Sequence, residues 1–239
     1  MPNLTHVPII WNDKELLVID KPAGMLALPD GYDPSVPHVK SVISPEHGPL
    51  WIVHRLDRFT SGVMVLARNA EAHQQLNTQF QDRKVKKAYH ALVLGSPEWD
   101  RKLVELPLRI NTGRRHRTMV DLNKGKPSAS QLMVRERFKG YSLVEAVPET
   151  GRRHQIRAHL SWEGYPIACD NLYGNQIEIL RSEIDPNFEA GTQPGEPVLK
   201  RPGLHAGSIE LFHPLDGQKR VFDSPLASDI QLTLKLLRS

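Results

Sequence analysis

The chain has 239 residues, of which 39% are hydrophobic and 24% charged, and its formal net charge is +4. This is the composition of an ordinary soluble globular protein, and no stretch approaches the roughly 18 to 20 apolar residues that a membrane span requires. The single cysteine, Cys169, excludes an internal disulfide. Because a lone cysteine is typical of proteins in a reducing compartment, we expect a cytoplasmic protein.

The first third of the chain alternates between apolar and turn-forming segments. Residues 16–19 predict a buried strand that ends at a Lys-Pro-Ala-Gly turn, and the proline-rich stretch from there to Leu50 predicts a loop without regular structure. Residues 62–67 predict a second buried strand. Asn69 then predicts the N-terminal cap of a helix that runs to about residue 83, because apolar residues recur every four positions along it.

The middle of the chain predicts three strands and a helix. The strands cover residues 87–94, 128–134 and 141–147, and the last two are separated by Gly140. Residues 153–163 predict a helix, which Gly164 terminates.

The last third predicts an irregular segment followed by a hairpin. Residues 175–203 are polar and contain prolines and glycines, so we expect an insertion or mobile loop with a short helix near 177–181. Residues 208–213 and 218–222 flank Asp216-Gly217 and predict a β-hairpin. This order lacks the regular alternation of a doubly wound fold, and predicts instead an α/β (α+β) fold with a mixed, largely antiparallel sheet, flanking helices and a central cleft.

Basic residues gather in four short segments, at 83–87, 114–117, 152–157 and 200–201. If these segments share one face of the molecule, they form a surface that binds the phosphates of a nucleic acid. The alternative is four separate solvated patches, and the spacing alone leaves both open.

One segment, His54-Arg55-Leu56-Asp57-Arg58-Phe59-Thr60-Ser61-Gly62, surrounds a single carboxylate with basic residues directly before a buried strand. The neighbouring cations favour the ionised form of Asp57, which suits a nucleophile or a base. The alternative is a loop that salt bridges hold against the sheet, since ion-paired carboxylates are common and mostly inert.

This segment resembles the central motif, HRLDxxTSG, of the RluA-type pseudouridine synthases. Four further segments resemble other motifs of that family in the same order: NDKELLVIDKPAG from Asn12, VKKAYHALVLG from Val85, PETGRRHQIRAHLSWEGYPIACDNLYG from Pro148, and Leu204-His205-Ala206 with His213-Pro214. The resemblance spans residues 12–227. It implies the pseudouridine synthase fold and an isomerase that acts on structured RNA, either ribosomal or transfer RNA.

The resemblance also implies roles for individual residues. Asp57 corresponds to the essential carboxylate, and Arg55 to an arginine that fills the space of the displaced nucleotide. Tyr89 corresponds to a tyrosine that stacks on the flipped uracil, and Arg157 to the arginine that pairs with the catalytic carboxylate. The remaining residues that the resemblance assigns to RNA binding and the base pocket are Arg58, Ile156 and Leu204.

These roles agree with the chemistry of the reaction. A uridine inside a base stack cannot be isomerised, so the nucleotide must be extruded, and a tyrosine platform offers stacking of about 1–3 kcal/mol to the extruded base. Because the reaction is neither a redox step nor a group transfer to another molecule, we expect no cofactor and no metal. Whether Asp57 attacks the sugar, adds to the base or acts as a base stays open at this point.

Two other classes of function compete with this interpretation. A non-catalytic RNA-binding protein could use the same fold to assist RNA folding. A glycoside hydrolase would require a second positioned carboxylic acid, and the motifs offer none for Asp57. A zinc site is disfavoured, because His154 and His159 are five residues apart and a helix would turn them to different faces.

We expect residues 1–239 to form a single catalytic domain that acts as a monomer. The central motif begins at residue 54, which leaves no room before it for the accessory RNA-binding module that many relatives carry. One departure from the family pattern is Cys169, which stands where a glycine usually precedes the Asp170-x-x-Tyr173-Gly174 motif. We expect this cysteine to cost little if the backbone there is ordinary.

Overall fold

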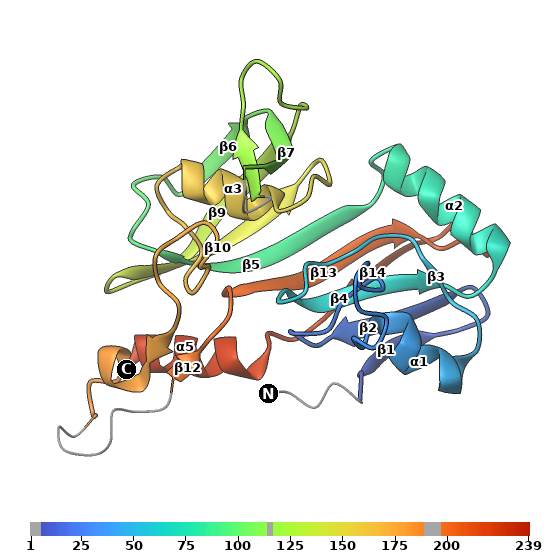
Figure 1. The fold of residues 1–239 in the computed structure, drawn as a ribbon, viewed down its shortest axis with the longest axis horizontal. Coiled ribbons are helices and arrows are strands. Elements are labelled where there is room, and N and C mark those ends of the chain that lie inside the picture. The colour runs from blue at the N-terminus through green and yellow to red at the C-terminus, as the bar shows by residue number, and fades with distance from the viewer. Residues whose placement is uncertain (1–5, 114–116, 189–196) are drawn as a thin grey trace. The chain divides into compact units, whose positions relative to one another are not determined.

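The computed structural model describes residues 6–113, 117–188 and 197–239. The chain forms two compact units. Unit 1 comprises Met1–Ala88 and His205–Pro225, and unit 2 comprises Tyr89–Leu204 and Leu226–Ser239. The chain passes between the units inside two strands, at residues 88–89 and 204–205, and Figure 1 shows its course by colour.

Unit 1 is built on a sheet with two helices. Its elements in chain order are β1 (Ile9–Asn12), β2 (Leu16–Lys21), α1 (Val39–His47), β3 (Trp51–Ile52), β4 (Ser61–Ala67), α2 (Ala70–Gln81), most of β13 (Leu204–Phe212) and β14 (Lys219–Asp223). Strands β2 and β4 are buried along nearly their whole length, as their continuous apolar sequences predict.

The strand pairing in unit 1 explains one glycine. β2 pairs antiparallel with both β1 and β4, whereas β13 pairs in parallel with β4 through His205↔Ser61 and Ala206↔Gly62. Gly62 has a φ of +113°, and a Cβ at this position would lie 2.2 Å from the carbonyl oxygen of Ala206. Only glycine therefore allows the two backbones to approach this closely directly after the Asp57 segment.

Helix α1 contradicts the loop predicted between the first strand and Leu50. The His38 imidazole accepts a hydrogen bond from the Ser41 amide, the Ser41 hydroxyl accepts one from the His38 amide, and Val39 and Ile43 are buried. This reciprocal cap and the apolar pair at i, i+4 outweigh Pro45, which lies inside the helix. The prediction was wrong because proline content concealed a short amphipathic pattern.

Helix α2 and the hairpin of unit 1 follow the prediction. The Asn69 side chain accepts a hydrogen bond from the Ala72 amide at 2.8 Å, and Ala72 and Leu76 are buried. The helix ends at Gln81, two residues before the predicted end. Strands β13 and β14 pair antiparallel, and Gly217 between them has a φ of +65°.

Unit 2 contributes an antiparallel set of strands, in which β10 pairs with β5 and β9, and β9 pairs with β6. Its elements in chain order are β5 (Lys86–Leu94), β6 (Arg101–Glu105), β7 (Leu108–Thr112), β8 (Arg117–Val120), β9 (Ala129–Phe138), β10 (Tyr141–Pro148), α3 (Gln155–Trp162), β11 (Ile179–Leu180), α4 (Arg181–Ile184), β12 (Pro197–Leu199) and α5 (Ser228–Arg238).

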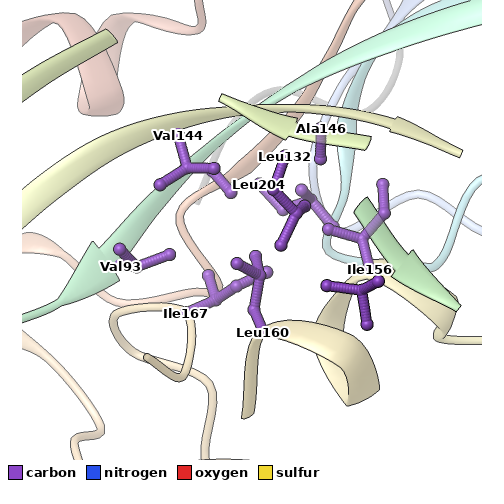
Figure 2. Close-up of a cluster of buried hydrophobic side chains, with 10 residues drawn as sticks. Val93, Leu132, Val144, Ala146, Ile156, Leu160, Ile167 and Leu204 are labelled. Atoms are coloured by element: carbon purple, nitrogen blue, oxygen red, sulfur yellow. The ribbon is translucent and has the colours of Figure 1, made fainter. Parts of the chain in front are cut away.

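Each face of this sheet carries an apolar core. On one face, Ala91 and Val93 of β5 pack with Ile156 and Leu160 of α3, and Figure 2 shows this cluster around Leu204. On the other face, Leu92 packs with residues of α5. Successive residues of a strand point to opposite faces, so the apolar run in β5 serves both cores.

Parts of the segment 175–203 form regular elements, at Ile179–Leu180, Arg181–Ile184 and Pro197–Leu199. The helix predicted at 177–181 is displaced, because β11 occupies residues 179–180 and α4 begins at Arg181. Ile179 and Leu199 are buried with Ile230 of α5, which anchors both ends of the segment. Residues 189–196 lie outside the described residues.

The predicted fold class, a mixed and largely antiparallel α/β arrangement, is confirmed. Helices that the structure describes are all too short or too polar to cross a membrane.

Candidate functional site

The Asp57 segment is a short loop between β3 and β4. Leu56 is buried and fixes the loop to the core of unit 1, while Asp57 itself is half-buried. The Asp57 carbonyl accepts a hydrogen bond from the Thr60 amide at 3.0 Å, which closes a turn under the carboxylate. A carboxylate on such a turn keeps a fixed direction at low conformational cost.

Lys21 attaches this loop to the end of β2. Its side chain is fully buried, and its Nζ donates to the carbonyl oxygens of Pro22, Met25 and Arg58 at 2.9, 2.9 and 3.2 Å. The Gly24 amide also donates to the Arg58 carbonyl at 2.8 Å. The Lys-Pro-Ala-Gly turn therefore holds the backbone of the residue that follows Asp57.

Two histidines brace the same loop. Nε2 of His54 accepts a hydrogen bond from the Val65 amide at 2.9 Å, and burial lowers the His54 pKa to about 3, assisted by the positive charge of Lys87. Nε2 of His205 lies 3.2 Å from the Ser224 carbonyl, so Nδ1 accepts from the Ser61 hydroxyl at 3.0 Å. Both histidines are therefore hydrogen-bonded within the fold of unit 1.

The two arginines that flank Asp57 are both exposed. Nε of Arg58 donates to the Gly24 carbonyl at 3.1 Å, and its guanidinium lies 5.4 Å from the centre of the Phe59 ring. Arg55 extends from the same loop. Both side chains are thus available at the surface of unit 1 beside the half-buried carboxylate.

Arg157 lies in α3 of unit 2 and is 9% exposed. Its Nε and Nη2 donate to the two carboxylate oxygens of Asp170 at 2.6 and 2.9 Å, and Asp170 is fully buried. Such a bidentate pair fixes the plane of the guanidinium. Asp170 therefore binds the edge of the guanidinium that carries Nε and Nη2.

Tyr173 supports Arg157 from one side. Its ring centre lies 4.9 Å from the guanidinium, and its hydroxyl accepts a hydrogen bond from the Thr118 amide at 2.7 Å and lies 3.0 Å from Nδ1 of His154. Burial raises the pKa of Tyr173, so the phenol stays protonated. His154, at a φ of 54°, directly precedes α3.

Three of the predicted site residues belong to one wall of unit 2. Ile156 and Leu204 are buried in the cluster of Figure 2, and the half-buried Tyr89 packs against it. Tyr89 pairs with Ala146 across β5 and β10. The wall is therefore apolar and ends in an aromatic ring, which is suitable for contact with a planar base.

The comparisons with known proteins identify the family. A family model described as RNA pseudouridylate synthase matches residues 15–162, more than half of the chain. The chain belongs to the RNA pseudouridylate synthase family. The matched region includes Asp57, Tyr89 and Arg157, and the enzyme class that the sequence predicts, an isomerase, is confirmed for the family.

Curated relatives agree with this assignment. Ribosomal large subunit pseudouridine synthase D of Nitrosomonas europaea is 37% identical over 97% of this chain and 65% of its own length. The corresponding protein of Pseudomonas aeruginosa is 36% identical over 98% of this chain and 72% of its own length. Ribosomal large subunit pseudouridine synthase C of Vibrio parahaemolyticus is 35% identical over 98% of this chain and 70% of its own length. The chain thus spans about two thirds of the length of these relatives.

Solved structures confirm the pseudouridine synthase fold. Human RNA pseudouridylate synthase domain containing 4 has a TM-score of 0.72 and 25% identity, over 97% of this chain and 93% of that one. Human RNA pseudouridylate synthase domain containing 1 has a TM-score of 0.73 and 23% identity, over 100% of this chain and 97% of that one.

Sequence analysis did not assign roles to the residues that position the predicted ones. Asp170 and Tyr173 stood in a quoted motif, and Lys21 in another, but a motif does not show what its members contact. The signal was present in Asp170, because an acidic residue in an otherwise apolar stretch indicates a buried ion pair. Within residues 6–113, 117–188 and 197–239, no cluster of three His, Cys, Asp or Glu side chains could hold a metal.

Proposed function

We propose that this protein isomerises uridine to pseudouridine in ribosomal RNA of the large subunit, with Asp57 as the essential carboxylate. The observation that carries the proposal is the family match across residues 15–162 together with relatives named for the large ribosomal subunit. Transfer RNA is the other structured RNA that the sequence motifs allow. We further propose a cytoplasmic monomer that uses neither metal nor cofactor, with both units forming one catalytic domain.

In the proposed reaction, the bond between the ribose carbon 1′ and nitrogen 1 of uracil breaks, and the uracil turns within the pocket. A bond then forms between carbon 1′ and carbon 5, and the proton of carbon 5 leaves for solvent while nitrogen 1 regains one. All heavy atoms stay in the molecule. Asp57 assists at the sugar or at the base, either of which requires its carboxylate to be ionised and directed by the turn at Thr60.

Arg157 is proposed to keep Asp57 ionised and aligned. A guanidinium can bind two carboxylates along different edges, and Asp170 occupies the edge of Nε and Nη2. The guanidinium, held in this plane, is the group that we propose to bind Asp57. A cation at this place lowers the cost of the charge on the reacting carboxylate.

The target nucleotide must leave its stack to reach this carboxylate, at a cost of a few kcal/mol. Arg55, exposed beside Asp57, is proposed to occupy the vacated space, and the exposed Arg58 to contact the RNA backbone. Tyr89 is proposed to stack on the extruded uracil, with Ile156 and Leu204 forming the apolar floor of the pocket.

The experiment is tritium release from large-subunit ribosomal RNA labelled at carbon 5 of uridine. Wild-type protein is expected to release tritium, and Asp57→Ala to release none above background. Asp57→Asn keeps the shape of the side chain without its charge, and should also be inactive. Activity of Asp57→Asn within tenfold of wild type would refute the role of the carboxylate.

Two further outcomes decide the substrate and the class. Tritium release from transfer RNA but not from ribosomal RNA would show that transfer RNA is the substrate. No release by the wild type from either RNA, with binding intact, would indicate a non-catalytic RNA-binding protein.

A further inference from the structure

Three lysines near the start of β5 differ in a way that the catalytic mechanism does not explain. Lys84 lies 3.0 Å from Asp82 and Lys86 lies 3.8 Å from Glu210, and their side chains are 57% and 73% exposed. The Lys87 side chain is half-buried, so it is less exposed than the other two. Within the described residues it forms neither an ion pair nor a hydrogen bond. The most enclosed of the three cations is therefore the one without an anion.

The surroundings of Lys87 are aromatic. Its Nζ lies 5.9 Å from the centre of the Phe80 ring, and Phe80 in turn stacks on His54 at 5.1 Å between ring centres. The His54 imidazole is neutral and bonded to the Val65 amide, so it supplies no negative charge. Burial lowers the pKa of Lys87, because desolvation disfavours the charged form of the amine.

The place of Lys87 relates it to the proposed site. Its positive charge lowers the pKa of His54, the histidine that begins the Asp57 segment, three residues before Asp57. It also precedes Tyr89 by two residues in β5, and residues i and i+2 of a strand point to the same face. Lys87 is thus close in sequence to the proposed platform for the base, and its charge acts on the histidine of the Asp57 segment.

A desolvated cation without an anion beside it is destabilising, and an external anion offsets that cost. RNA carries one negative charge per phosphate, whereas a uracil carbonyl is neutral and cannot balance the ammonium. Lysine is moreover a compact point charge that suits a single phosphate oxygen.

We propose that the Lys87 ammonium binds a backbone phosphate of the RNA beside the uridine that is modified. This inference rests on the proposed function, because it takes RNA to be the substrate. Lys87 in this role does not react; it binds the substrate through its backbone and is expected to affect KM more than kcat.

The test measures equilibrium binding of a large-subunit ribosomal RNA transcript by filter retention, at several KCl concentrations, for wild type and Lys87→Met. One lost phosphate contact weakens binding by on the order of tenfold at low salt and reduces the slope of log K against log salt by about one. Lys87→Arg keeps the charge and should retain most of the slope.

The control is Lys219→Met. Lys219 lies in β14 of the same unit, is 52% exposed and pairs with Glu210 at 3.0 Å, so this variant removes the same charge from a site outside the proposal. It should leave the slope within experimental error of wild type. An equal loss in both variants would show an effect of net charge alone and overturn the proposal.

Thermal unfolding separates a binding role from a structural one. Because Lys87 is an uncompensated cation, Lys87→Met is expected to melt at the same temperature as wild type or higher. A variant that melts lower or does not fold would show that the ammonium supports the fold, which contradicts the proposal. An unchanged salt slope would do so as well.

Binding is read without catalysis, so the result does not depend on tritium release. A normal slope change with an inactive wild type would contradict the proposed function and leave the Lys87 contact standing. Normal activity of the wild type with an unchanged salt slope for Lys87→Met would support the proposed function and overturn the Lys87 contact.

Discussion

Main-chain groups hold the Asp57 segment in unit 1, whereas side chains hold Arg157 in unit 2. Around Asp57, the fixing contacts are carbonyl and amide groups of Gly24, Arg58 and Thr60, gathered by Lys21. Around Arg157, they are the carboxylate of Asp170 and the ring of Tyr173. The carboxylate segment should thus be sensitive to backbone geometry, and the arginine to the loss of single charges.

The largest expected effect concerns the backbone of unit 1. Gly62→Ala places a methyl group 2.2 Å from the Ala206 carbonyl oxygen at a φ of +113°. Backbone strain and overpacking together should lower the free energy of unfolding by about 4 kcal/mol, as measured by urea denaturation. In the matched control Gly217→Ala, φ is +65° and nothing lies within 4 Å, so the loss should be about 1 kcal/mol. Equal losses would contradict the close approach of β4 and β13.

The second effect concerns the charge pair of unit 2. Asp170→Asn leaves the buried guanidinium of Arg157 without its bidentate carboxylate, and should cost about 3 kcal/mol of unfolding free energy. The control is Asp229→Asn, whose partner is Arg201 and whose own side chain is 35% exposed. Solvent screens that pair, so its loss should be smaller. A loss below 1 kcal/mol for Asp170→Asn would show that Arg157 is held by other contacts.

A third effect is the response of unit 1 to acid. The folded-state pKa of His54 is about 3, below the usual value of 6.5, so the unfolded chain binds the proton first. His54 therefore costs no stability above pH 6.5. As the pH falls from about 6 to 3, protonation of His54 in the unfolded chain lowers the free energy of unfolding by about 1.4 kcal/mol per pH unit. His54→Gln should flatten the decline of unfolding free energy between pH 6 and 4. An identical pH profile in the variant would mean that His54 is protonated in the folded protein.

The smallest effect concerns Cys169. Its φ of 60° is a conformation that favours glycine, so the condition under which the cysteine would cost little, an ordinary backbone, is not met. Cys169→Gly removes this strain but also a buried side chain, and the two effects should nearly cancel, within about 1 kcal/mol. Burial raises the thiol pKa to about 12, so iodoacetamide at pH 8 should label Cys169 only in unfolded protein. Rapid labelling of the folded protein would contradict the burial of this residue.

The sequence by itself determined the elements whose signals are local. The apolar runs of β2 and β4, the Asn69 cap of α2 and the Asp216-Gly217 hairpin depend on neighbouring residues, and all were predicted. The motifs also identified the family, because a motif records residue types at fixed spacing. The helix at Val39–His47 escaped prediction, since the proline content of the stretch concealed its short amphipathic pattern.

Tertiary structure alone decided what positions the proposed reacting groups. Arg157 and Asp170 are thirteen residues apart, and Lys21 and Arg58 thirty-seven, so their contacts require a folded chain. It also decided the surroundings of two lysines that the sequence shows as one basic cluster: the fold brings Glu210 to Lys86 and the Phe80 ring to Lys87. The sequence determines which residues are charged, but the fold determines which of those charges form ion pairs.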